Sequence, residues 1–167
     1  MTRNNAREIA VHMIFSLGFS TDSAEEVLDA QLTRSRFAEL AEEFPLYEQY
    51  PSEKQERYIC DLVRGVHSHS YELDDYISRY AKGWSFARIP RMAAAIMRTA
   101  MYEVLYMPDV PNAAAINAAV EMTKSYEAQE VVSFVNGILG TFVRSEFAET
   151  PPKPEKKQVE ETPKTEE

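Results

Sequence analysis

The side chains that could bind a metal ion or act as nucleophiles are few, and their spacing matches no known site. His67 and His69 are two positions apart, so on a helix they point about 200° away from each other and cannot easily hold one metal ion. Cys60 is the only cysteine, which excludes a disulfide framework and a multi-thiolate metal site. Asp74 and Asp75 are adjacent, a spacing that suits solvent contact more than a carboxylate pair. There is no HExxH motif, glycine-rich phosphate loop or GxSxG motif, so we expect a binding or scaffolding protein without catalytic residues, metal or cofactor.

Two arginines near the N-terminus could bind an anion. Arg3 and Arg7 are one helical turn apart on an amphipathic stretch at about residues 4–19, and a helix N-terminus adds favourable potential for phosphate. Phe15 lies two turns beyond Arg7 in the same row, where an aromatic ring could stack on an unpaired base. The alternatives are ordinary solubilising arginines and a core contact for Phe15.

Lys124 and Tyr126 stand at the end of another predicted helix. A cation at this position also complements the helix dipole, so Lys124 has a purely structural explanation as well. Asn136 and Gly137 lie inside the last predicted helix, where glycine costs about 1 kcal/mol relative to alanine. That cost is usually tolerated where another backbone approaches closely, so we predict a close helix contact at Gly137.

The net charge of −9 on 167 residues argues at first against a nucleic-acid partner. However, residues 21–76 carry fourteen acids and five bases, so nearly all the acidity belongs to this middle segment. The two ends of the folded part could therefore share a surface that does not repel a polyanion, although a solvated acidic face explains the segment equally well. The single cysteine and the lack of an 18-residue apolar run favour a cytoplasmic protein without a membrane span.

The elements that must position these side chains are predicted to be helices, because apolar residues recur at helical spacing in about seven blocks. The first two blocks are expected at about residues 4–19 and from Asp22 or Ser23 to before Pro45. The third begins at a capping box formed by Ser52 and Gln55 and carries apolar residues as far as Val66. The others are expected from Tyr71 to Tyr80 with a stop at Gly83, from Ile89 to Leu105, from Pro111 to Tyr126, and from Val131 to Val143. Residues 148–167 are rich in Pro, Glu and Lys and are predicted to be a disordered tail.

The C-terminal half carries a family resemblance. It reads IMRTAMYEVLYMPD and then VPNAAAINAAVEMTKSYEAQEVVSFVNGILGTFV. This resembles the NusB family of transcription antitermination factors, whose C-terminal half typically runs LRxAxYE, a VP turn, AINEAVELAK-x-F and FVNGVL. The matching positions are Met97-Arg98, Ala100, Tyr102-Glu103, Val110-Pro111, Ala115-Ile116-Asn117, Ala119-Val120-Glu121, Lys124, Tyr126 and Phe134 to Leu139. Ala6-Arg7-Glu8 adds a match in the first helix, and the resemblance covers about residues 3–147.

The resemblance implies an all-α fold of two small packed helical bundles over residues 1–147. It also implies a function, which is to bind boxA-type RNA of nascent ribosomal transcripts together with NusE, a ribosomal protein of the small subunit. In this way the RNA polymerase antitermination complex resists termination. The alternative is a helical protein–protein adaptor or homodimer that has the same fold and binds little RNA.

The resemblance also implies two sets of site residues. The RNA-binding set is Arg3, Asn4, Asn5, Arg7, Phe15, Lys124, Tyr126 and Glu130, and the partner-binding set is Arg88, Arg91, Ala93 and Ala94. Several positions depart from the family pattern. Asn4 and Asn5 stand where relatives usually have arginines, so we expect reduced affinity for RNA alone. Ala93 and Ala94 stand where relatives often have an acidic and then a basic residue, which predicts a weaker or rearranged NusE contact. Glu127 replaces a glycine, which predicts a different turn or mild strain there.

Overall fold

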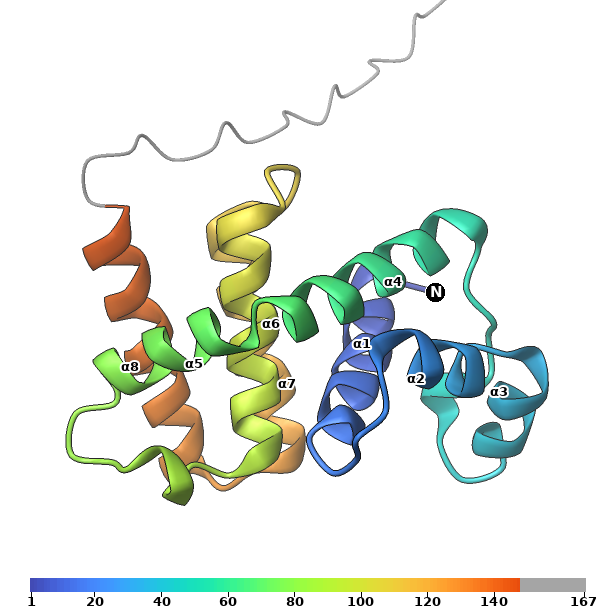
Figure 1. The fold of residues 1–167 in the computed structure, drawn as a ribbon, viewed down its shortest axis with the longest axis horizontal. Coiled ribbons are helices and arrows are strands. Elements are labelled where there is room, and N and C mark those ends of the chain that lie inside the picture. Colours follow the sequence, from blue (N-terminus) through green and yellow to red (C-terminus); the bar gives the residue numbers. More distant parts are fainter. Residues whose placement is uncertain (148–167) are drawn as a thin grey trace, which may run out of the picture.

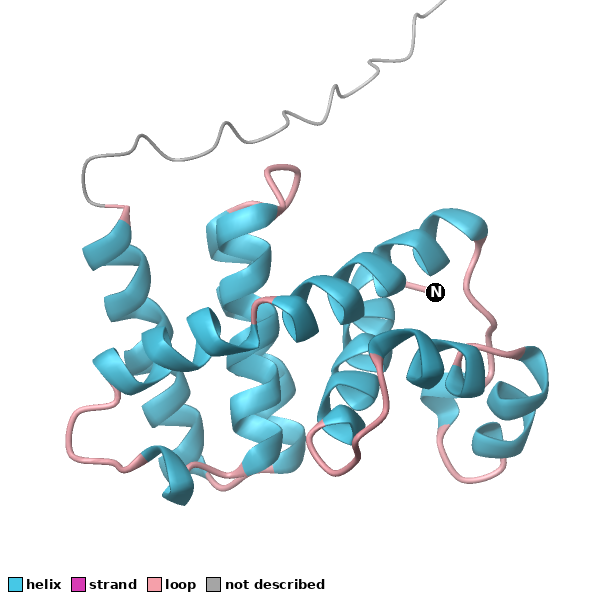
Figure 2. Ribbon diagram, viewed as in Figure 1, coloured by secondary structure: helices cyan, strands magenta, loops and turns pink. Residues whose placement is uncertain are grey.

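The computed structural model describes residues 1–147, and every regular element in that range is helical (Figure 1, Figure 2). The α-helices are α1 (Arg3–Leu17), α2 (Ala24–Gln31), α3 (Arg34–Ala41), α4 (Glu53–Ser68), α5 (Ser70–Tyr80), α6 (Arg91–Tyr106), α7 (Asn112–Tyr126) and α8 (Gln129–Glu146), and η1 (Pro45–Tyr47) and η2 (Phe86–Arg88) are short 3₁₀ helices. This confirms the all-α fold class. Within the described range, no helix is long and apolar enough to cross a membrane. The predicted tail, residues 148–167, lies outside the described residues.

The helices form two groups, α1 to α4 and α5 to α8, and the first helix joins them (Figure 1). Helix α1 packs against α4 on one side and α6 on the other, so it belongs to the N-terminal group and also contacts the C-terminal one. Its apolar stripe is fully buried at Ala6, Ile9 and Ala10, as the helical spacing predicts. The position of α1 between the groups is what brings its N-terminal polar residues next to the C-terminal half.

The predicted long helix before Pro45 is wrong, because the structure divides it into α2 and α3. Leu32 leaves the helical region with φ −90° and ψ 62°, and Thr33 then caps α3 by accepting a hydrogen bond from the backbone N–H of Arg36. Threonine competes well for the N-cap position because its hydroxyl satisfies an otherwise unpaired backbone donor. This extra helix makes eight α-helices among the described residues instead of about seven.

Helices α4 and α5 form an almost continuous rod across both groups (Figure 1). The capping box that Ser52 and Gln55 predict at the start of α4 is present, since each side chain pairs with the backbone N–H of the other. His69, with φ −106° and ψ 16°, ends α4 and precedes α5, so one non-helical residue separates the two segments. Gly83, with φ +82°, lies in the turn after α5, a backbone conformation that favours glycine.

The glycine at a close helix contact is Gly65 and not Gly137. The prediction of a close contact at Gly137 is wrong, because a Cβ placed there meets nothing within 4 Å. The tight glycine is Gly65 in α4, where a Cβ would lie 2.0 Å from Cζ of Tyr102 on α6. Gly65 therefore makes room for a tyrosine ring between α4 and α6.

Candidate nucleic-acid interface

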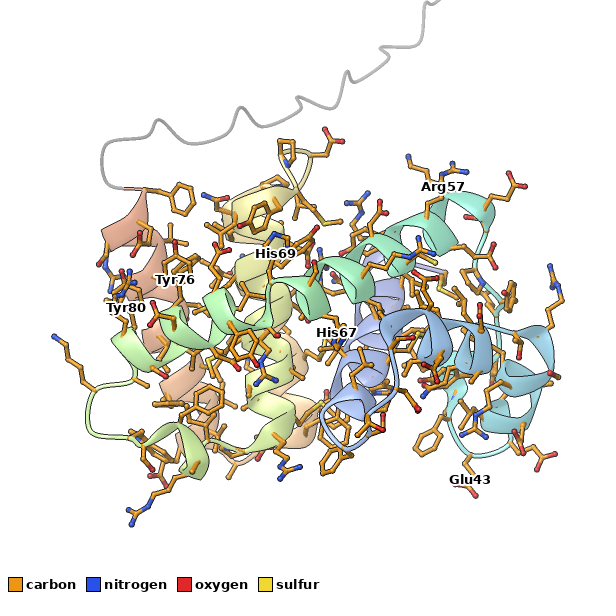
Figure 3. The ribbon with its side chains drawn as sticks, in the orientation of Figure 1. Glu43, Arg57, His67, His69, Tyr76 and Tyr80 are labelled. Carbon is orange, nitrogen blue, oxygen red and sulfur yellow. The ribbon has the colours of Figure 1, made fainter. Side chains whose placement is uncertain are left out.

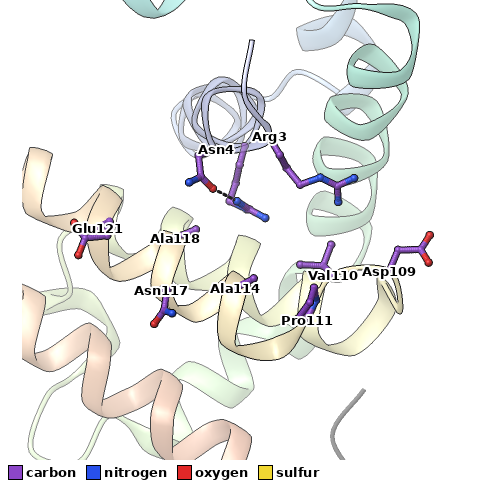
Figure 4. Close-up of a pocket in the computed structure, with 10 residues that line it drawn as sticks. Arg3, Asn4, Asp109, Val110, Pro111, Ala114, Asn117, Ala118 and Glu121 are labelled. Atoms are coloured by element: carbon purple, nitrogen blue, oxygen red, sulfur yellow. Dashed lines mark hydrogen bonds between the residues drawn. The ribbon is translucent and has the colours of Figure 1, made fainter. Parts of the chain in front are cut away.

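A groove of about 450 Å³ separates the N-terminal half of α1 from α7 (Figure 4). The α1 side carries polar side chains, whereas the α7 side is made mainly of small residues. The lining residues are Arg3, Asn4 and Arg7 from α1, Asp109, Val110 and Pro111 from the loop between α6 and α7, and Ala114, Asn117, Ala118 and Glu121 from α7. Because alanines leave the α7 side flat, a ligand in this groove can approach the polar side chains of α1 closely.

Arg7 is buried, so the prediction that Arg3 and Arg7 are two neighbouring surface cations is wrong. Only 4% of Arg7 is exposed, and its Nε and Nη2 donate to both carboxylate oxygens of Glu103 at 2.5 and 2.9 Å. The hydroxyl of Tyr58 donates to Glu103 Oε2 at 2.9 Å, and Asn4 Oδ1 accepts from Arg7 Nη1 at 2.6 Å. Burial works against the charge of Arg7, but the hydrogen bond and charge of Glu103 raise its pKa above the usual value. Arg7 therefore joins α1 to α6 and contributes little free positive charge to the groove.

Two further cations that form no ion pair within residues 1–147 lie on the other side of Arg3, and the sequence analysis did not predict them. The guanidinium of Arg3 lies 4.7 Å from the ring centroid of Tyr58, and a second groove of about 880 Å³ begins there, between α4 and the end of α6. Lys54 and Arg57, exposed at the start of α4, line this groove with Arg3. The three-residue spacing of Lys54 and Arg57 places them on one helix face, which is the signal that could have identified them. Asp61 lines the same groove and offsets part of this charge.

Tyr126 also approaches α1, from the C-terminal end of α7. Its hydroxyl donates to Glu8 Oε1 at 2.5 Å and lies 2.6 Å from His12 Nε2. Lys124, one turn from the groove-lining Glu121, pairs with that carboxylate at 2.6 Å. The structure thus brings Tyr126 and Lys124 to the same helix pair as Asn4 and Arg3, but the arginines and Lys124 do not form one unpaired positive patch.

The turn after α7 accommodates its glutamate without strain. Glu127 has φ −134° and ψ 159°, an extended conformation open to any residue, so of the two predicted alternatives, a different turn or mild strain, the strain is absent. Glu130 is exposed in the first turn of α8, where a carboxylate complements the helix dipole. Asn5, at the other end of the region, is half-buried and its backbone N–H donates to the capping hydroxyl of Thr2.

The exposed aromatic residue in this region is Phe19, in the turn that follows α1, and not Phe15. Phe15 is half-buried against the core, and its ring centroid lies 4.8 Å from that of Phe19. Phe19 is 58% exposed, and the guanidinium of Arg91 lies 4.5 Å from its ring centroid. The core contact that competed with the stacking role of Phe15 is therefore present.

The four predicted partner-binding residues separate into two classes. Arg88 and Arg91 are exposed beside the start of α6, whereas Ala93 and Ala94 are buried in the interior. The expectation that Ala93 and Ala94 present side chains to a partner is wrong, because both lie on faces of α6 that neighbouring helices cover. Helix α6 is buried on most of its sides, so little of its surface is left for a partner.

The two histidines of the α4–α5 region and the adjacent acids Asp74 and Asp75 do not come together as a metal site. His67 and His69 point to different sides of the rod (Figure 3), and among the described residues no group of three potential ligands could hold a metal ion. Asp74 pairs with Arg98 and Asp75 with Arg79, so the two adjacent carboxylates do face different neighbours.

Comparison with known proteins assigns the chain to a family. The model of the NusB family matches residues 4–144. The transcription antitermination protein NusB of Acetivibrio thermocellus is 39% identical over 145 residues, covering 86% of this chain and 90% of its own length. The NusB of Carboxydothermus hydrogenoformans is 37% identical over 140 residues, covering 84% and 91%. Among solved structures, T. maritima NusB superposes with a TM-score of 0.72 at 26% identity, covering 86% of this chain and 92% of that one. The chain therefore belongs to the NusB family of non-enzymatic transcription antitermination proteins.

Proposed function

We propose that this chain binds boxA-type RNA of nascent ribosomal transcripts together with NusE, within an RNA polymerase antitermination complex. Two observations carry the proposal: the groove between α1 and α7 is lined by Arg3 and Asn4 on its α1 side, and Lys124 and Tyr126 lie beyond the groove lining, at the C-terminal end of α7. Single-stranded RNA is typically bound by cations along its backbone and by aromatic rings against its bases. The groove offers one exposed arginine and amide groups, and Tyr126 at the end of α7 adds a partly exposed aromatic side chain next to α1.

The distribution of charge supports weak RNA binding by the chain alone. Arg7 is paired with Glu103 and Lys124 with Glu121, whereas Arg3 forms no ion pair among residues 1–147. Few free cations mean few phosphate contacts, and the acidic segment at residues 21–76 adds repulsion at long range. A basic partner bound near that segment would offset the repulsion and add contacts of its own. By thermodynamic linkage, RNA must then tighten the protein–protein contact by the same factor.

The test is to titrate boxA-like RNA with and without NusE in one buffer at fixed salt. We expect weak binding by the chain alone, tighter binding with NusE, and a NusE affinity that rises equally when RNA is present. In the variant Arg3→Met, the slope of log affinity against log salt should fall by about 0.7, the value for one phosphate contact on a single strand. Arg144→Met, which removes an exposed arginine of α8, is the matched control. Tight binding without NusE, or a NusE affinity indifferent to RNA, would contradict the cooperative function.

The pairing of Arg7 with Glu103 favours one second candidate, a protein–protein adaptor with little RNA binding. In that case the chain contributes its helical surface to a complex and the RNA contacts come from other components. A titration in which NusE binds the chain while boxA-like RNA adds nothing to either affinity would select this adaptor role.

A further inference from the structure

We propose that Glu8 and His12 are positioning residues that clamp Tyr126 across the space between α1 and α7, and that His12 carries its proton on Nε2. The RNA role of this clamp rests on the function proposed above. Glu8 and His12 are one helical turn apart on α1, so their side chains lie on the same face. Both reach the hydroxyl of Tyr126, at 2.5 Å from Glu8 Oε1 and 2.6 Å from His12 Nε2.

The direction of each hydrogen bond follows from counting protons. The Tyr126 hydroxyl has one proton, which it donates to Glu8, so it must accept a hydrogen bond from Nε2–H of His12. A neutral imidazole protonated on Nε2 has its lone pair on Nδ1, which lies 2.6 Å from the hydroxyl of Tyr47. Tyr47 therefore donates to His12, His12 donates to Tyr126, and Tyr126 donates to Glu8.

The surroundings of the cluster keep this arrangement in place. Tyr47 is buried, and burial raises the pKa of its hydroxyl to about 12, so it retains the proton that it donates. Burial also lowers the pKa of His12, although the charge of Glu8 acts in the opposite direction, so the neutral imidazole is favoured. The three tyrosine and histidine rings are in contact, with the His12 centroid 5.9 Å from that of Tyr47 and 5.8 Å from that of Tyr126.

The clamp matters because Tyr126 is the last residue of α7, where side chains are otherwise poorly held. Tyr126 is 38% exposed and its hydroxyl is hydrogen-bonded to α1, so the ring is ordered before a base stacks on it. Ordering one such side chain on binding lowers affinity by about 2- to 10-fold, a loss that an ordered ring avoids. Loss of the clamp should therefore weaken RNA binding by this factor while the ring itself remains present.

The experiment uses the full chain with NusE and boxA-like RNA. Tyr126→Phe keeps the ring without the hydroxyl, and His12→Leu removes the donor; each should weaken RNA binding about 2- to 10-fold, and the double variant should be no weaker than either single variant. His12→Gln should restore binding, because its amide can still donate to Tyr126. Tyr106→Phe removes another tyrosine hydroxyl that contacts a carboxylate, that of Glu72, and should bind RNA as the parent does.

Two further measurements separate the clamp from the proposed function. Without RNA, ¹⁵N spectra of the His12 side chain should report a proton on Nε2; a proton on Nδ1 would overturn the clamp whatever RNA does. Tyr126→Ala should weaken RNA binding at least as much as Tyr126→Phe. If Tyr126→Ala weakens binding while Tyr126→Phe and His12→Leu behave as the parent, the clamp is refuted and the RNA surface stands. If neither Tyr126→Ala nor Arg3→Met weakens binding, the RNA surface itself is wrong, and so is the RNA role of the clamp.

Discussion

Replacing Arg7 by methionine should destabilise the whole fold, because it leaves the Glu103 carboxylate buried without its cation. Arg7 is 4% exposed and Glu103 is fully buried, so water cannot replace the two lost hydrogen bonds. Removing one partner of a buried ion pair costs about 3–5 kcal/mol. For a domain of this size, each kcal/mol lowers the melting temperature by roughly 3–4 °C, so we expect a fall of roughly 10–20 °C.

The assay is thermal and urea unfolding followed by far-ultraviolet circular dichroism. Arg3→Met is the matched control, since Arg3 is exposed and its loss should change the melting temperature little. The double variant Arg7→Met/Glu103→Leu should regain at least half of the lost stability, because a buried ion pair can often be replaced by apolar residues at little cost. The reasoning is refuted if Arg7→Met has the same melting temperature as Arg3→Met, or if the double variant is less stable than Arg7→Met.

Three further outcomes follow from particular residues. Because folding lowers the pKa of His12 below 6.5, the unfolded state binds more protons than the folded state just below that pH, and stability should fall as the pH drops below about 6.5. Urea unfolding between pH 5 and 8 measures this fall, and the variant His12→Gln should lack it. Gly137→Ala should raise stability by about 0.5–1 kcal/mol because its Cβ enters open space, whereas Gly65→Ala should not show this gain because Tyr102 must move; equal thermal shifts would contradict the contrast. Truncation after Phe147 should leave the melting temperature within a few degrees, because the removed residues carry only one apolar side chain larger than alanine, and a larger fall would mean that they contribute to the core.

Local sequence signals predicted most helices, because caps and apolar periodicity act over a few residues. The capping box at Ser52 and the N-cap at Ser23 are both present where they were expected. The break at Thr33 was not predicted, because the helical spacing of apolar residues continues through it and a single capping residue is a weaker signal than that spacing. Boundaries of this kind are the least reliable part of such predictions.

The candidate site was less predictable, because its contacts join residues far apart in the chain. Arg7 was interpreted as a surface cation since nothing within a few positions reveals Glu103 as its partner; a lone glutamate within the apolar stripe of α6 was the available hint. Ala93 and Ala94 were assigned to an interface by analogy with charged residues in relatives, whereas alanine itself is a residue type often found in cores. The hydrogen bond between His12 and Tyr126 joins residues 114 positions apart, and no sequence pattern near either residue predicts it.

The contact between α1 and α6 also determines when the protein can fold during its synthesis. Arg7 and Glu103 are 96 residues apart, which at about 5–20 residues per second corresponds to a delay of roughly 5–20 s on the ribosome. During that interval α1 has emerged with an apolar stripe and a cation whose buried partner has not yet been made. A chain stalled before Glu103 would therefore expose one side of its first helix, and such exposed apolar surface promotes aggregation or chaperone capture.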